Sequence, residues 1–159
     1  MSDLYQDYLN SLSKLPFVSF QGRKGGLDTV GHAFVGIGVQ IDAGLRIYER
    51  LFGLYPDGGT MKAVKSIFTP VSGKLDESWK DLAWDTEIIT TIDDDHRKVV
   101  LDLFEEWKGS APEYSLLANG AMNCSSLVSA VAASVDMRVP GGAGSTRPWV
   151  FIDTLKALQ

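Results

Sequence analysis

The segment Ala121-Met122-Asn123-Cys124-Ser125-Ser126-Leu127-Val128 is the most informative in the chain, because it joins a loop to an apolar helix and holds the single cysteine. Asn123 is a favoured N-cap residue, and the sequence to Val135 is compatible with a helix. A thiol in the first turn of a helix lies near free backbone N–H groups and the positive end of the helix dipole. Both favour the thiolate, the nucleophilic form of cysteine. We therefore expect Cys124 to be a nucleophile.

The composition is that of an ordinary globular domain with an acidic balance of charge. The chain has 159 residues, of which 45% are hydrophobic and 22% charged, and its formal net charge is −5. One domain over residues 1–159 is the default at this length. The negative charge argues against nucleic-acid and membrane-surface partners. One cysteine and two histidines argue against a disulfide framework and a zinc site, so we expect no metal and no other cofactor.

The first residues carry no recognisable targeting signal. Residues 1–7 are polar and acidic, whereas a secretory signal begins basic and continues apolar. No apolar run approaches the roughly 18 residues of a membrane span. We expect synthesis in the cytoplasm and, for action elsewhere, a dedicated export route.

Hydrophobic periodicity and turn residues predict an α+β chain. Helices are expected over residues 3–15, 94–109, 123–135 and 148–158, with Pro16, Asp93, Gly109 and Pro148 at their ends. Strands are expected over residues 17–20, 29–41, 45–55 and 84–92, separated by a loop at residues 22–26 and a turn at residues 42–44. The strand at 29–41 is apolar or small on both faces, which is typical of a central strand. Residues 61–68 fit either a short helix or a strand, and residues 70–77 are expected to form a loop. The order predicts a small antiparallel sheet packed against helices.

His32, on the central strand, is the natural base for Cys124. Its ordinary pKa lies near neutrality, so it can take the thiol proton and return it to a leaving amine. The Cys124 N–H, at a helix N-terminus, can face a developing oxyanion. A purely structural role is an alternative for both residues. A lone cysteine is commonly a small buried side chain, and a lone histidine on a strand commonly contributes to packing. The second histidine, His96, follows an acidic helix start, and we expect it on the solvated surface.

The short sequence motifs around Cys124 and His32 resemble those of circularly permuted papain-like hydrolases. The motifs are Gly31-His32-Ala33-Phe34-Val35-Gly36, Gly53-Leu54-Tyr55-Pro56, Tyr114-Ser115-Leu116-Leu117 and Asn123-Cys124-Ser125. In that group the histidine strand comes first and the cysteine helix comes late. Members are similar to NlpC-type cell-wall endopeptidases, lecithin:retinol acyltransferase-like proteins and permuted isopeptidases. The resemblance covers residues 28–158 and implies a permuted papain-like fold with Cys124 as nucleophile and His32 as base.

The residue that orients the histidine is the weakest part of the pattern. A turn at residues 42–44 places residues 52–54 across from His32, and Phe52, Gly53 and Leu54 cannot orient an imidazole. A hairpin centred between Gly25 and Gly26 places Ser19 opposite His32, which makes Ser19 the candidate orienting residue. An ordinary strand serine, with a backbone carbonyl or water in the orienting role, is an equal alternative.

The expected function is that of a cysteine amidase or peptidase. The segment from Asn123 to Ala133 with Val139-Pro140 also looks like the nucleophile helix of peptidoglycan amidases delivered by type VI secretion. This resemblance implies a cell-wall-targeting bacterial effector that cleaves peptidoglycan stem peptides in a target periplasm, with an immunity protein or a secretion component as partner. The alternatives are an acyltransferase or thioesterase, a ubiquitin-like isopeptidase, and a non-catalytic binding domain.

Overall fold

The computed structural model describes residues 4, 7, 13–25, 31–41, 44–77, 83–117 and 120–159. Its elements in chain order are β1 (Leu15–Arg23), β2 (His32–Ile41), β3 (Leu45–Pro56), α2 (Gly59–Lys65), β4 (Gly73–Asp76), β5 (Thr86–Thr91), α3 (Asp94–Gly109), α4 (Cys124–Ser134) and α5 (Pro148–Ala157). The described part of the chain is therefore α+β, as predicted.

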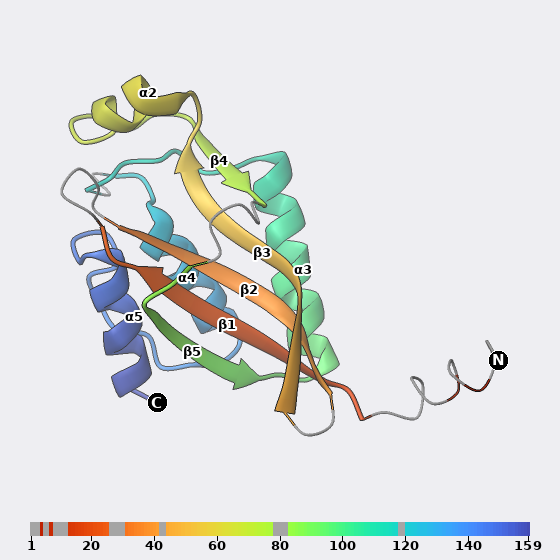
Figure 1. Cartoon of the computed structure of the whole chain (residues 1–159). Helices are drawn as coiled ribbons and strands as arrows, with labels where there is room; N and C mark the ends of the chain where they lie inside the picture. Colours follow the sequence, from red (N-terminus) through yellow and green to blue (C-terminus); the bar gives the residue numbers. More distant parts are fainter. Residues whose placement is uncertain are drawn as a thin grey trace.

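The five strands form one antiparallel sheet in the order β4-β3-β2-β1-β5 (Figure 1). Consecutive strands β1, β2 and β3 are neighbours, and β5 pairs with the other edge of β1. The prediction that residues 29–41 contain a central strand is confirmed, because β2 is the third of five strands and most of its residues are buried. Residues 29 and 30 of the predicted strand lie outside the described residues, and the strand begins at His32, after Gly31.

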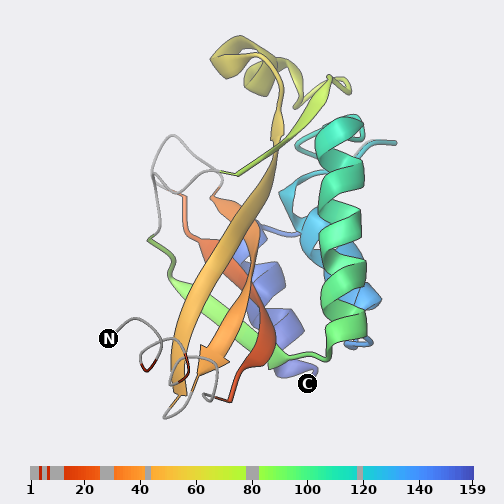
Figure 2. The same cartoon turned by 90° about the vertical axis from the view of Figure 1, so that its right-hand side faces the viewer.

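Three helices cover one face of the sheet (Figure 2). α4 packs under β2, α5 packs under β1 and β5, and α3 runs along the β3 and β4 side. Alternate strand residues point into the core between these layers. Its members include Val18, Phe20, Val35, Ile37, Phe52 and Leu54 from the strands and Phe104, Leu127, Val131, Phe151 and Ile152 from the helices. α2 stands apart at one end of the molecule, above β4 (Figure 1).

The opposite face of the sheet carries a second apolar layer. Phe17, Phe34 and Leu51 are buried there but do not belong to the core beneath the helices. The rings of Tyr48 and Trp84 pack on this layer, with centroids 5.2 Å from Phe17 and 6.3 Å from Phe34, respectively. Both faces of the central strand are thus covered.

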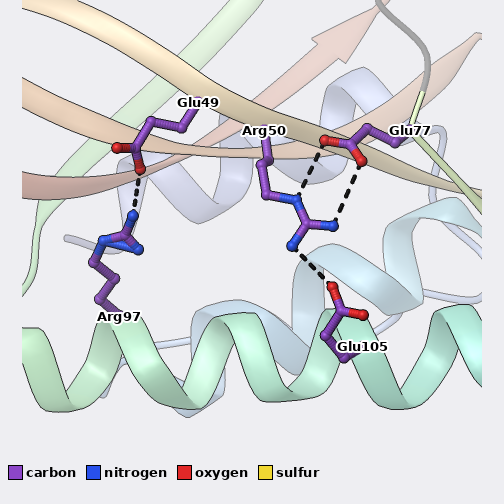
Figure 3. Close-up of polar contacts among 5 residues, drawn as sticks. All are labelled: Glu49, Arg50, Glu77, Arg97 and Glu105. Carbon is purple, nitrogen blue, oxygen red and sulfur yellow. Dashed lines mark hydrogen bonds and ion pairs between the residues drawn. The ribbon is translucent and has the colours of Figure 1, made fainter.

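Ion pairs join β3 to α3 (Figure 3). Arg50 donates to Glu105 of α3 at 2.9 Å and to Glu77, just after β4, at 3.3 Å. Arg97 of α3 pairs with Glu49 of β3. These pairs are partly exposed, so each contributes little energy, and their main effect is to fix the orientation of α3 along the sheet.

The first strand is longer than the sequence indicates. Gly22 and Arg23, predicted to begin a loop, continue β1 and pair with Ala33 and His32. The loop prediction is wrong at Gly22, because this glycine is needed for the close approach of helix α5 to strand β1 rather than for a turn. A Cβ atom there would lie 2.8 Å from the Trp149 Cα of α5.

The structure of residues 59–77 decides between the helix and the strand that the sequence allows for residues 61–68. α2 shows the helical alternative to be correct for this stretch. The loop predicted over residues 70–77 is wrong in part, since β4 pairs with β3 through Gly73 and Pro56. A strand of four residues offers too little periodicity to be recognised.

The helix predicted over residues 3–15 lies mostly outside the described residues. The prediction is wrong at its final residue, because Leu15 is the first residue of β1 and pairs with Gln40. Pro16 does not end a helix but occupies the second position of this strand, where its carbonyl accepts the Ile92 N–H. Proline is tolerated at the start of a strand.

The other predicted helix ends agree with the structure. The Asp93 side chain accepts the His96 N–H and caps α3, which includes Gly109 as its last residue. Pro148 occupies the first turn of α5.

None of the helices in the described ranges is long and apolar enough to cross a bilayer.

Candidate active site

Cys124 is the first residue of α4, as the sequence predicts, and Asn123 is its N-cap. The Asn123 Oδ1 atom accepts the Ser126 N–H at 3.1 Å, and the Ser126 hydroxyl accepts the Asn123 N–H at 3.0 Å. This reciprocal pair satisfies two of the backbone donors that a helix start leaves free. The Asn123 amide also donates to the carbonyls of Leu116 and Gly144 at 3.3 and 3.4 Å, so one side chain ties both flanking loops to the cysteine.

The sulfur of Cys124 is buried, with only 3% of the residue exposed. Burial raises the pKa of the thiol above its ordinary value, although the N–H groups of Ala33, Ser125 and Cys124 itself point at the sulfur and oppose this effect. The expectation that the helix start favours a thiolate is therefore wrong for the resting state, because desolvation outweighs the helix N-terminus. The resting group is a neutral thiol.

A cavity of about 120 Å³ lies beside Cys124. It is lined by Leu116, Leu117, Asn123, Cys124 and residues 144–148. These loops are the ones that Asn123 holds together, so the N-cap of α4 also shapes the cavity.

His32 is the first residue of β2 and is 9% exposed. Its ring stacks on Tyr55 with centroids 4.4 Å apart and on Phe34 at 5.8 Å. The Nε2 atom has no hydrogen-bond partner among the described residues. Burial, with a smaller contribution from the positive charge of Arg23, lowers the pKa of His32 to about 3. The imidazole is therefore neutral at physiological pH.

The structure brings the backbone beside His32 to the sulfur of Cys124. The Ala33 N–H that points at the sulfur belongs to the very next residue, and a peptide bond places its nitrogen about 2.4 Å from the His32 Cα. Ala33 and Cys124 share the core beneath the helices. The His32 side chain leaves β2 on the other face, where it stacks on Phe34 and Tyr55. Proton transfer to this ring requires a rotation that turns a ring nitrogen toward the sulfur.

Ser19 does not lie beside the histidine. It pairs with Gly36, whereas Arg23 pairs with His32. The predicted register is wrong by four residues, or about 13 Å along a strand, because the hairpin is centred further along the chain than Gly25 and Gly26. The Ser19 hydroxyl instead neighbours Tyr48, since both lie within 3.1 Å of the position that a Gly36 Cβ would occupy.

A β-bulge changes the residue that faces His32 across β3. Gly38 pairs with Tyr48 while Ile37 pairs with Arg50, so Glu49 is an extra residue. Continued to the end of β2, this register places Tyr55 opposite His32 rather than the predicted residues 52–54. A bulge leaves no reliable signal in the sequence, and its one-residue shift is enough to exchange the neighbour.

Tyr55 and Tyr114 are site residues that the sequence does not assign. Tyr114 is 5% exposed and is held by two backbone hydrogen bonds to Val71, at 2.7 and 2.8 Å. Burial and the proximity of Cys124 and Tyr55 raise the pKa of Tyr114, so its phenol stays protonated. Tyr55 belongs to the motif Gly53-Leu54-Tyr55-Pro56 and Tyr114 to the motif Tyr114-Ser115-Leu116-Leu117. The presence of a tyrosine in each of these motifs was the sequence feature that could have identified both as site residues.

His96 lies at the other end of α4 from Cys124. Its ring contacts Asp93 at 2.8 Å and Asp136, just beyond α4, at 3.1 Å. These two carboxylates raise the pKa of His96. The sequence predicts a solvated surface residue, but the side chain is only 32% exposed, because its two ring contacts join α3 to the end of α4.

The described residues contain no cluster of three or more histidine, cysteine, aspartate or glutamate side chains placed to hold a metal ion. No protein-family model, curated protein or solved structure compared with this chain matches it.

Proposed function

We propose that the chain is a cysteine hydrolase of the permuted papain-like type that cleaves an amide bond, with Cys124 as nucleophile and His32 as base. One observation carries the proposal. Cys124 is the first residue of α4, its sulfur lies against the Ala33 amide that follows His32, and the residue is part of the lining of a cavity. The order of a histidine strand before a cysteine helix is also that of the group that the sequence resembles.

Because the Cys124 thiol and the His32 imidazole are both neutral in the resting protein, the proton is transferred during the attack on the substrate and no ion pair forms beforehand. A neutral thiol and a neutral imidazole carry no attraction that would hold them together. In the reactive arrangement the His32 ring accepts the thiol proton as the sulfur bonds to the amide carbon. The same proton then passes to the leaving amine as the C–N bond breaks. Water, deprotonated by His32, hydrolyses the thioester to a carboxylic acid and restores the thiol.

The helix start supplies the groups that stabilise the oxyanion. The N–H groups of Cys124 and Ser125 already point at the sulfur. A carbonyl carbon bonded to that sulfur places its oxygen close to these donors, which are also at the positive end of the helix dipole. The protonated phenol of Tyr114 is a further O–H donor near Cys124.

The substrate that we propose is a peptidoglycan stem peptide. This choice rests on the resemblance to cell-wall amidases, and the exposed Arg147 at the rim of the Cys124 cavity suits it. Stem peptides carry free carboxylates, which a guanidinium recognises well. An exported effector of this kind acts in a target-cell periplasm and requires an immunity partner in the producing cell.

Purified sacculi test this proposal. Wild type and His96→Ala are expected to release new peptide ends that mass spectrometry detects, while Cys124→Ala and His32→Ala release none. His96→Ala is the matched control, because it removes the only other histidine at the far end of α4. Release by Cys124→Ala, or no release by wild type, contradicts the proposal. Fatty-acyl esters and ubiquitin-like fusions incubated in parallel identify an acyl hydrolase or an isopeptidase instead.

A non-catalytic binding domain is the second candidate. The stacking of His32 on Tyr55 and Phe34, away from the Cys124 core, favours it. In that case Cys124→Ala and wild type bind the same peptide with equal affinity and neither cleaves it.

A further inference from the structure

Helix α2 projects from the body of the molecule at the end of β3, as both views show (Figure 1, Figure 2). The chain enters and leaves this projection at a closed base, where the Asp57 N–H donates to the Ser72 carbonyl at 2.8 Å. Beside this contact, Val71 forms a β-bridge with Tyr114. We call the part beyond the base, residues 58–70, the α2 tip.

The exposed side of the α2 tip is apolar, which is the reverse of the usual arrangement in a surface helix. Met61, Val64 and Phe68 are 83%, 54% and 76% exposed. Their spacing of three and four residues places them on one face. The polar Ser66 is turned inward and is buried. Single exposed apolar residues are normal, but a group of them on one face is typical of an interaction site.

The apolar side chains are held outward because the inner side of the tip is anchored. The Ser66 carbonyl accepts the Leu116 N–H and the Ser115 hydroxyl, both at 3.0 Å. Ser115 is buried, and Leu116 is part of the lining of the Cys124 cavity. The tip cannot turn its apolar face towards the core without breaking these bonds. The same bonds fix it beside the wall of the cavity.

The charge of the tip is opposite to that of the whole chain. Residues 58–75 contain three lysines and no aspartate or glutamate, in a chain with a net charge of −5. Lys62 and Lys65 are exposed on α2 and form no ion pair with another of the described residues. The carboxylates that flank this segment, Asp57 and Asp76, lie at its base. Charge complementarity therefore favours an anionic partner at the tip.

We propose that the α2 tip inserts into the headgroup layer of an anionic lipid bilayer. Met61, Val64 and Phe68 enter the boundary of the acyl chains, while Lys62 and Lys65 extend their aliphatic stems to the lipid phosphates. A soft lipid layer accommodates a convex tip, whereas a folded protein would need a cavity that receives it.

The negative charge of the whole chain does not prevent this contact. Charges that are separated by more than a Debye length, about 8 Å at physiological salt, are largely screened at an exposed surface. The lysines at the tip therefore determine the local attraction, and the carboxylates on the body of the molecule have little effect. Binding requires neither the Cys124 thiol nor turnover, so this inference is independent of the proposed hydrolase activity.

Sedimentation of the full chain with lipid vesicles tests the inference. Vesicles of phosphatidylcholine and phosphatidylglycerol in equal parts are expected to bind the chain saturably. Vesicles of phosphatidylcholine alone should bind it at least tenfold more weakly, since each lysine contributes about fivefold on an anionic surface. Cys124→Ala should bind as the wild type does. No binding to the mixed vesicles, or equal affinity for the two compositions, overturns the proposal.

Two variants with matched controls locate the surface. Phe68→Ser is expected to weaken binding to the mixed vesicles at least fivefold, whereas Leu45→Ser, an exposed position at the opposite end of β3, should not change it. Lys62→Gln should weaken binding about fivefold, and Lys156→Gln, also exposed but on α5, should leave it unchanged. All four side chains are exposed, so the variants are expected to fold. Unchanged affinity in Phe68→Ser or in Lys62→Gln overturns the proposal.

Sedimentation velocity without lipid distinguishes a lipid surface from a second copy of the chain as the occupant of the tip. The proposal predicts the same association state for the wild type and Phe68→Ser. A concentration-dependent dimer that Phe68→Ser abolishes would assign the tip to a second copy and overturn the proposal.

Discussion

The imidazole of His32 stacks on the phenol ring of Tyr55, with the ring planes inclined by 29°. The contact exists because the bulge at Glu49 advances β3 by one residue relative to β2. It holds the ring on the face of the sheet opposite the helices, in a buried and neutral state. Any catalytic use of His32 must therefore overcome this contact.

His32 is expected to remain neutral across the physiological range. Its folded pKa of about 3 lies below the ordinary value of 6.5, so the unfolded chain binds a proton first as the pH falls. Stability should decrease below pH 6.5 and continue to decrease towards pH 3, by about 1.4 kcal/mol per pH unit at most from this group. NMR titration of the ring should show no midpoint between pH 5 and 8. A midpoint near the ordinary value for His32 contradicts the burial seen here.

His96 is expected to have the opposite effect. Asp93 and Asp136 raise its folded pKa above the ordinary value, so the folded chain binds the proton more tightly. The stabilisation is complete below the unfolded pKa and disappears as the pH rises through the raised folded pKa. Urea unfolding should show that His96→Ala loses more stability at pH 5.5 than at pH 8.5. Asp136→Asn should reduce this difference, and an equal loss at both pH values would contradict a raised pKa of His96 in the folded chain.

Asn123 is expected to stabilise both a helix and two loops. Asn123→Ala removes the cap on Ser126 and the bonds to Leu116 and Gly144, and should cost about 1–2 kcal/mol of unfolding free energy. Asn123→Asp keeps an acceptor for the cap and loses only the amide donors, so its cost should be smaller. Ser134→Ala, near the other end of α4, is the control and should change stability by less than about 0.5 kcal/mol. Equal losses for the two Asn123 variants contradict a separate capping contribution.

Cys124 is expected to react slowly with alkylating reagents in the resting protein. Burial raises its pKa, so the rate of labelling by iodoacetamide should keep rising above pH 8.5, the ordinary midpoint of a thiol. An unfolded sample in urea provides the reference rate. A plateau reached near pH 6 shows a preformed thiolate and contradicts the resting state described here.

Much of the fold was predictable because it depends on local patterns. The two apolar parities of residues 29–41 indicate a central strand, and Asn123, Asp93 and Pro148 mark three helix starts through capping chemistry. The pairing order of β1, β2 and β3 follows from the intervening turns.

The rest depends on contacts distant in sequence. Gly22 and Gly73 have the appearance of loop residues but are strand residues at which another segment of backbone comes close. The register errors at Ser19 and at residues 52–54 have the same origin, since neither the hairpin centre nor the bulge is determined by strand composition. The protonation state of Cys124 could not be predicted either, because a helix start is evident in the sequence and its burial is not.

The most direct test of the account is the rate at which p-nitrophenyl acetate acetylates Cys124 at pH 7, measured by intact mass in His32→Ala and in His96→Ala. The account predicts that His96→Ala reacts as the wild type does and that His32→Ala is slower by about 100-fold or more, the usual contribution of a general base. Equal rates in the two variants would show that the imidazole of His32 does not activate the sulfur and would contradict the account.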